Sequence, residues 1–368
     1  MRKIVLAGVM TFAGIILSGL QTANAQFTLT NGNLAIYRVG DGTAALGSTG
    51  TAVFIDEYTT AGTLVQSIAV PTTTSGSNHR LVASGTATSE GLITRSSDGK
   101  SLVFAGYDAA LGTTGVKSSG TLTIGIIKNG ATDTATSTTT LNGDNIRGVA
   151  YDGGSGFWLS GANGLAYVNY ASSGAGTSLR TANTRAVSIY NNQLYLSTGA
   201  GTGGVYSLGT GKPTSGTPTA TSVAASSSPY QFQLLDESAN VAGLDTLYLA
   251  DDGGSVKKFT FDGSSWNASG TTSLTNVRGL TAVDDGHGGV TLFATTSSST
   301  GPGGLYKIAD TSGFGNTLTA AATLLASASS NTAFRGVAFT PVPEPTSMGL
   351  IGMASIALLA RRRRSAKA

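Results

Sequence analysis

Residues 145–151 read NIRGVAY, and this phrase returns along the chain in a form that decides the fold. Its echoes are TRAVSI at 184–189, VRGLTA at 277–282 and FRGVAF at 334–339. Each is a short run of apolar and small residues with an arginine near its start. Runs of this length, bounded by Gly, Asn, Asp or Ser and without a sustained 3.6-residue period, are typical of β-strands. The sequence therefore predicts an all-β fold with almost no helix.

Two further phrases follow these strands and complete a repeated unit. The second phrase is FWLS at 157–160, LYLS at 194–197, LYLA at 247–250 and LFAT at 292–295. The third follows a Gly-rich turn, as GLAYV at 164–168, GVYSL at 204–208, GSVKKF at 254–259 and GLYKI at 304–308. A Ser/Thr-rich stretch then leads to the next unit. We expect the branched and aromatic side chains to fill the space between neighbouring sheets, and the glycines to form the turns.

The length of the unit indicates which β-fold it builds. Its equivalent starting positions are Glu90, Arg147, Arg185, Gln231, Arg278 and Arg335. Their mean spacing of about fifty residues matches a four-stranded propeller blade. The prediction is a six-bladed β-propeller. A seven-bladed ring, with a further unit in residues 71–89 or 209–229, is the alternative, and a right-handed β-helix is a third fold because Gly/Thr-rich exported proteins also adopt it.

The last unit is truncated, because the chain turns to a Pro-rich segment soon after Phe339. Three strand-like runs near the N-terminus, at 32–39, 52–58 and 64–70, lack an opening strand of their own. Residues 334–340 and 33–70 together would make one complete blade. Such a blade joins the two ends of a ring and leaves only short, protected edges.

The N-terminus predicts export. Met1, Arg2 and Lys3 precede an apolar run at 4–20, and small residues follow it. Ala23 and Ala25 occupy the −3 and −1 positions of a signal-peptidase site, so cleavage is expected before Gln26. Residues 1–25 are thus predicted to be a secretory signal helix, and 26–340 the propeller domain; an uncleaved membrane anchor is the alternative.

The C-terminal residues 341–368 have three parts. A Pro-rich segment, TPVPEP at 340–345, is incompatible with a helix and precedes an apolar stretch at 346–360 and four arginines. As a helix the apolar stretch would span about 22 Å, less than the ~30 Å hydrocarbon core. We expect a short transmembrane helix, with its arginines in the cytoplasm and the body of the protein outside.

This tail resembles the PEP-CTERM sorting signal of Gram-negative bacteria. The matching residues are Val342, Pro343, Glu344 and Pro345 for the signature, and Arg361, Arg362, Arg363 and Arg364 for the basic end. The resemblance implies recognition and processing by an exosortase, after export by the secretion machinery. It also implies a place in the cell envelope or extracellular matrix of bacteria that make exopolysaccharide and biofilm. A plain C-terminal membrane anchor is the alternative.

Charge argues against a nucleic-acid partner. Seven of the 22 Lys and Arg residues lie in the two terminal segments, and residues 26–340 hold more acidic than basic side chains. Phosphate binding needs clustered Lys and Arg on the folded surface.

The absence of cysteine excludes disulfides, thiolate metal sites and cysteine nucleophiles.

The repeated arginines are the candidate binding residues. If Arg147, Arg185, Arg278 and Arg335 open the innermost strands, their guanidinium groups would ring one mouth of a central channel. They could then bind a carboxylate, a sulfate or a uronic-acid sugar. The structural alternative is that each arginine caps a neighbouring blade through backbone carbonyls or a loop aspartate.

Other candidate sites have weaker patterns. The Asp-Gly turns at 152–154, 251–254 and 284–289 could bind Ca²⁺, but none has the spacing of a calcium loop and Asp-Gly is a common turn. His79 and His287 could act as general bases, but neither has a serine partner in a nucleophile elbow. The carboxylate pairs Glu90–Asp98 and Asp236–Glu237 are too ordinary to indicate a glycosidase. No catalytic or metal residue is assigned.

These observations favour a non-enzymatic, exported propeller that serves as a structural or binding module at the cell surface. The first alternative is an enzyme that acts on polysaccharides at the channel mouth. The second is a Ca²⁺-binding or small-ligand-binding surface protein. An extracellular polysaccharide is the partner that the arginines would suit.

Overall fold

A computed structural model describes residues 27–141, 143, 145–299 and 302–342. These residues form an all-β, propeller-like fold, as predicted, and their one helical element is the short 3₁₀ turn Val116–Ser118. Among them no helix is long and apolar enough to cross a membrane. The predicted signal helix, the cleavage residues Ala23, Ala25 and Gln26, and the sorting residues from Pro343 onward lie outside the described ranges.

The repeated units predicted from residue 145 onward are four antiparallel four-stranded sheets. The first holds β9 (Ile146–Tyr151), β10 (Gly156–Gly161), β11 (Gly164–Asn169) and β12 (Thr177–Arg180). The second holds β13 (Thr184–Tyr190), β14 (Gln193–Thr198), β15 (Gly204–Leu208) and β16 (Ala220–Ala225). The third holds β17 (Pro229–Leu235), β18 (Thr246–Asp251), β19 (Ser255–Phe261) and β20 (Trp266–Ser273). The fourth holds β21 (Val277–Asp284), β22 (Val290–Thr296), β23 (Gly304–Asp310) and β24 (Thr323–Ser327).

The two ends of the described chain meet in a fifth, nine-stranded sheet. Its strands are β25 (Ala333–Phe339), β1 (Leu34–Val39), β2 (Gly50–Tyr58), β3 (Leu64–Ala69), β4 (Val82–Ser84), β5 (Thr94–Arg95), β6 (Leu102–Tyr107), β7 (Leu122–Lys128) and β8 (Ala131–Thr138). β1 pairs antiparallel with β25, with Leu34 opposite Phe339. The predicted pairing of the N-terminal run with the last repeat is therefore present. β2 pairs with both β3 and β4, and β4 in turn contacts β6, so a short strand joins two groups of strands.

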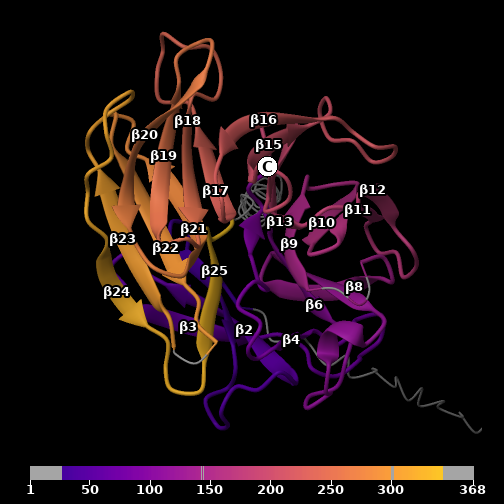
Figure 1. Cartoon of the computed structure of the whole chain (residues 1–368). Helices are drawn as coiled ribbons and strands as arrows, with labels where there is room; N and C mark the ends of the chain where they lie inside the picture. The colour runs from indigo at the N-terminus through magenta and orange to yellow at the C-terminus, as the bar shows by residue number, and fades with distance from the viewer. Residues whose placement is uncertain (1–26, 142, 144, 300–301, 343–368) are drawn as a thin grey trace, which may run out of the picture.

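The sheets are arranged around a common centre (Figure 1), with one strand of each group innermost. These inner strands are β5, β9, β13, β17, β21 and β25, and each contacts the next in this order, with β25 returning to β5. Just before β5, two backbone hydrogen bonds join the chain to the neighbouring inner strands. Leu92 N donates to Arg147 O at 2.8 Å, and Gly336 N donates to Gly91 O at 3.0 Å. The stretches that a seventh unit would need, 71–89 and 209–229, contain short strands of the sheets above and no sheet of their own.

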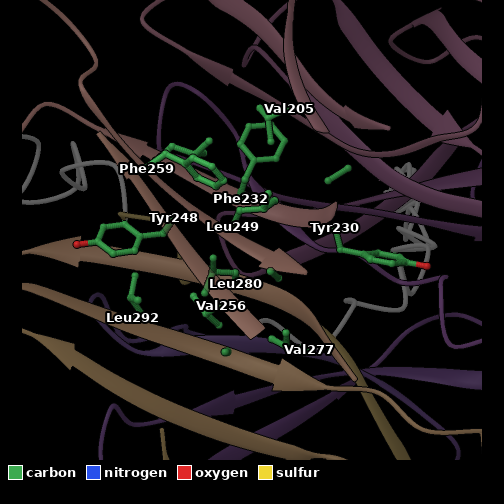
Figure 2. Close-up of a cluster of buried hydrophobic side chains, with 14 of the residues drawn as sticks. Val205, Tyr230, Phe232, Tyr248, Leu249, Val256, Phe259, Val277, Leu280 and Leu292 are labelled. Carbon is green, nitrogen blue, oxygen red and sulfur yellow. The ribbon is translucent and has the colours of Figure 1, made fainter. Parts of the chain in front are cut away.

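The core lies between neighbouring sheets. Successive side chains of a strand point to opposite faces of its sheet, so the apolar ones are directed into these spaces. Figure 2 shows Phe232 and Leu249 of the β17–β20 sheet meeting Leu280 of β21, with Tyr230 at the edge of the cluster. Trp158 is buried between the β9–β12 sheet and the β13–β16 sheet, and its indole N–H donates to Pro213 O at 2.7 Å. Such contacts fix the sheets against one another and set the geometry at the centre.

Candidate functional site

A cavity of about 270 Å³ opens where the six inner strands end. Each strand contributes to its wall: Arg95 from β5, Tyr151 from β9, Tyr190 from β13, Gln233 from β17, Thr281 from β21 and Phe339 from β25. We call this cavity the tail-side mouth, because Phe339 leads into the last described residues, 340–342. The predicted ring of arginines lies at the opposite ends of the inner strands, where those strands begin.

Gln231 forms the floor of the tail-side mouth. Its side chain is almost fully buried, and its amide reaches across the centre of the molecule. Nε2 donates to Ile93 O at 2.7 Å, while Oε1 accepts from Leu280 N at 3.3 Å and from Val337 N at 3.4 Å. One side chain thus ties β17 to β21, to β25 and to the residue that precedes β5. The repeat alignment identified Gln231 only as the starting position of its unit. The signal that could have singled it out is that most equivalent positions hold arginine, whereas this one holds glutamine.

The wall of the mouth is polar and carries one charge. Of the described residues that line it, Arg95 is the only charged one. Its guanidinium makes no hydrogen bond or ion pair with a described residue, and burial lowers its pKa. Tyr190 is held by a hydrogen bond from its hydroxyl to Phe232 O at 2.8 Å, and burial raises the pKa of this hydroxyl.

The four predicted arginines contact neighbouring strands and turns. Arg147 donates to Thr184 O at 3.0 Å and to the Asn183 side chain. Arg185 donates to Ser228 Oγ at 2.8 Å and lies 4.5 Å from the ring centre of Tyr230. Both arginines thus contact the neighbouring sheet, as expected if the repeated arginines cap neighbouring blades rather than bind a ligand.

The remaining two arginines behave in the same way. Arg278 binds both carboxylate oxygens of Asp252, at 2.9 and 2.8 Å. Like Arg185, it also lies against the ring of Tyr230, 4.9 Å from the ring centre. Arg335 is fully buried and donates to Gly85 O at 2.9 Å. Because it has no exposed surface, Arg335 cannot present its charge to a ligand.

Glu90 is a buried carboxylate beside this arginine. Oε1 accepts from the Tyr107 hydroxyl at 2.6 Å and from Asn145 Nδ2 at 2.8 Å, and Oε2 accepts from Ser84 N at 3.0 Å. Burial raises the pKa of Glu90 to about 7, against the lowering effect of these hydrogen bonds and of the Arg335 charge. Asp98, considered above as its partner, is exposed and accepts from Ser96 Oγ at 2.5 Å, so the two do not form a shared site.

Glu90 should make stability depend on pH. Because its folded-state pKa lies above that of an unfolded glutamate, Glu90 favours folding at low pH, and this contribution is lost as the pH rises from about 4.5 through about 7. The Glu90→Gln variant is neutral throughout. Its unfolding free energy relative to the parent chain should therefore rise by about 3 kcal/mol between pH 4.5 and pH 8, measured by urea denaturation. A relative stability that stays constant over this range would contradict the assignment.

His79 has a serine neighbour that the sequence did not reveal. Its Nδ1 lies 3.0 Å from Asp108 Oδ2, and its Nε2 lies 3.3 Å from Ser137 Oγ. This is the order of groups in a Ser-His-Asp triad. Ser137, however, is only 2% exposed and lies in the paired strand β8, so a substrate has no approach to it. Arg80 also binds Asp108, at 2.9 Å.

The Asp-Gly turns use their carboxylates locally. Asp152 accepts from two backbone N–H groups of its own turn and binds Lys212 at 3.2 Å. Asp285 accepts from the backbone N–H groups of His287 and Gly289. Within the described part of the chain, no group of three or more His, Cys, Asp or Glu residues could hold a metal ion. Asp236 is exposed, and burial, together with nearby acidic groups, raises the pKa of Glu237 to about 7.

The sequence after the mouth matches a known family model. Residues 341–364 match the model of the PEP-CTERM protein-sorting motif. The chain carries a PEP-CTERM motif. Such a motif implies an exported protein that is sorted at the cell envelope, as the resemblance of the tail predicts.

Solved structures resemble the body in fold alone. A putative 6-phosphogluconolactonase from Bacteroides uniformis has 13% identity and a TM-score of 0.45, with 81% of this chain and 83% of that chain covered. A chain of a nidogen/laminin complex has 10% identity and a TM-score of 0.47, covering 85% and 99%. The WD40 β-propeller domain of Doa1 has 14% identity and a TM-score of 0.35, covering 59% and 64%. No curated protein matches the chain in sequence.

The PEP-CTERM motif begins beside the tail-side mouth. Phe339 lines the cavity, and Thr340 Oγ1 then donates to Thr30 O at 2.6 Å. Val342 N donates to Gly99 O at 2.9 Å, in the turn that follows β5. Of the predicted sorting residues, Val342 is the one within the described ranges, and it is exposed. The body therefore presents its cavity and the start of its sorting motif on the same face.

Proposed function

We propose that this chain is a non-catalytic binding module of the cell envelope or extracellular matrix, sorted there by an exosortase, and that it binds its ligand in the tail-side mouth. The observation that carries the proposal is a polar cavity built by all six inner strands. Cavities that bring together a few convergent polar groups are where proteins bind small molecules. The PEP-CTERM motif supports the location.

The proposal includes a ring of six blades. Divided at β4, the nine-stranded sheet becomes two groups of four strands: β25, β1, β2 and β3, and β5 to β8. With the four other sheets these make six blades. The hydrogen bonds from Leu92 and Gly336, which join β5 to the inner strands on both sides, support closure of the ring. Closure matters for function because it places the six strand ends around one mouth.

A binding role fits the described side chains better than the enzymatic alternative. The arrangement that most resembles a catalytic one, at His79, has a buried serine. The raised pKa of Glu90 could suit a general acid, but this carboxylate is fully engaged inside the protein. The turn carboxylates that a Ca²⁺ site would need are occupied by backbone N–H groups. The mouth is an accessible polar site to which all six inner strands contribute.

A substitution that fills the mouth tests this function. Ser97 lines the cavity and is exposed, so Ser97→Trp should cover the opening while leaving the core intact. Glycan-array screening of the full chain in non-ionic detergent should give a bound saccharide, and the variant should lose at least tenfold in affinity for it. Ser215→Trp, in an exposed turn away from the mouth, is the matched control and should bind as the parent chain does.

Two results would contradict the proposal. Equal binding by Ser97→Trp and the parent chain would place the ligand elsewhere on the body. Turnover of a polysaccharide by the purified chain, lost on substitution within the mouth, would establish an enzyme instead. Thermal unfolding of each variant separates a blocked mouth from a damaged fold.

A further inference from the structure

The guanidinium of Arg95 differs from those of the repeated arginines. Arg147, Arg185, Arg278 and Arg335 each donate hydrogen bonds to a neighbouring strand or turn. Arg95 lies at the end of β5 rather than near the start of an inner strand, and it donates to no described residue. A guanidinium has five N–H donors in a fixed fork, and a protein normally gives them acceptors. The structure leaves these donors available to a ligand.

The surroundings of Arg95 favour an anion. Its charge is the only one among the described residues of the cavity wall, and its side chain is exposed at the opening, where a ligand can reach it. Two acidic side chains act on the wall residue Tyr151 and have partners of their own. Asp98 accepts from Ser96 and from Lys100 N, and Asp152 binds Lys212. A guanidinium without a carboxylate partner in its own protein can pair with an anion from solution. A carboxylate fits the guanidinium fork with two parallel hydrogen bonds.

The rest of the wall suits the hydroxyl groups of a sugar. Ser97, Ser188, Asn191 and Gln233 supply hydroxyl and amide groups that can both donate and accept hydrogen bonds. Phe339 also lines the cavity, and its ring packs edge-on against Phe293. The volume of about 270 Å³ lies at the small end of the range for ligand pockets, so the mouth suits one small unit or the end of a longer chain. A peptide carboxylate would also meet the charge, but the ring hydroxyls of a sugar, each of which can donate and accept, match a wall of hydroxyl and amide groups more closely.

We infer that the tail-side mouth recognises a carboxylate-bearing saccharide, a uronic-acid unit, with Arg95 as the residue that binds the carboxylate. This inference rests on the proposed function and makes it more specific. It moves the anion-binding role from the repeated arginines to an arginine at the other end of the inner strands. Arg95 then determines specificity, and the hydroxyl and amide groups orient the sugar ring.

The test compares charged and neutral forms of one ligand. Oligogalacturonate and its fully methyl-esterified form are titrated calorimetrically into the full chain in non-ionic detergent. The parent chain should bind the acid form at least tenfold more tightly than the ester. Arg95→Gln should bind the two forms equally and as weakly as the parent chain binds the ester. Arg95→Lys should recover part of the preference, because lysine keeps the charge without the fork. Lys117→Gln, at an exposed lysine outside the mouth, is the charge-matched control.

The outcomes separate this inference from the function on which it rests. If Ser97→Trp abolishes binding of both forms but Arg95→Gln changes neither, the mouth binds a ligand without reading its carboxylate, and only the inference fails. If neither variant changes binding, both fail. If a peptide with a free C-terminal carboxylate competes better than oligogalacturonate, the ligand is a peptide and the saccharide assignment is overturned. Equal thermal unfolding of Arg95→Gln and the parent chain excludes misfolding as the cause of a loss.

Discussion

Replacing Arg335 with methionine should lower the free energy of unfolding by about 3–5 kcal/mol at pH 8, the cost typical of breaking a buried charge interaction. Arg335 has no exposed surface, and its Nη2 is bonded to Gly85 O. Burial lowers its pKa to about 10, and the charge of Glu90 acts in the opposite direction. Without Arg335, the ionised carboxylate of Glu90 loses its neighbouring positive charge, and Gly85 O loses a donor.

The loss caused by Arg335→Met should be smaller at pH 5 than at pH 8. With its pKa at about 7, Glu90 is largely neutral at pH 5 and then needs no counter-charge. Urea denaturation at the two pH values measures the difference. In the double variant Arg335→Met with Glu90→Gln, the loss should become independent of pH over this range. A single-variant loss of equal size at both pH values would show that the two charges do not interact.

Replacing Gly336 with valine should lower the free energy of unfolding by about 3 kcal/mol or more, as overpacking against fixed atoms does at its upper end. A Cβ atom at this position would lie 2.5 Å from Ile93 N, 2.7 Å from Leu92 Cα and 2.8 Å from Gly91 O. All three are backbone atoms, so no side chain can move aside to make room. The substitution separates β25 from the segment before β5, where the proposed ring closes.

Gly174→Val is the matched control for Gly336→Val. No atom lies within 4 Å of the Cβ position at Gly174, so this variant should unfold within about 0.5 kcal/mol of the parent chain. Thermal and urea unfolding of the two variants measure the contrast. A Gly336→Val protein as stable as the control would falsify the close approach of β25 to residues 91–93.

The architecture could be predicted because its information is local and repeated. Alternation and turn residues identify strands such as Leu194–Leu196, and the truncated unit after Phe339 predicts the pairing with Leu34. The joining strand β4 has no such pattern, because three residues carry no measurable periodicity. The sequence therefore predicts the groups of strands but not the link between the first two.

The site was harder to predict because it depends on which end of each inner strand is open. The repeated arginines are conspicuous in the sequence, but their role depends on residues 26 to 250 positions away, such as Asp252 for Arg278 and Gly85 for Arg335. Ser137 lies 58 residues from His79, and no spacing rule connects them. Arg95 belongs to the least regular unit, so the repeat alignment gave it no special position.

The chain leaves the body through Val342, on the same face as the tail-side mouth. Because Val342 is hydrogen-bonded to the body, only residues 343–345 separate it from the apolar stretch, and three residues reach at most about 11 Å. A lipid-embedded tail would therefore keep this face towards the bilayer and too near it for a bulky polymer to enter freely. Cutting the chain just beyond Val342 would turn a sheltered opening into an accessible one. Cleavage would then release the protein from the membrane and expose its binding site in a single step.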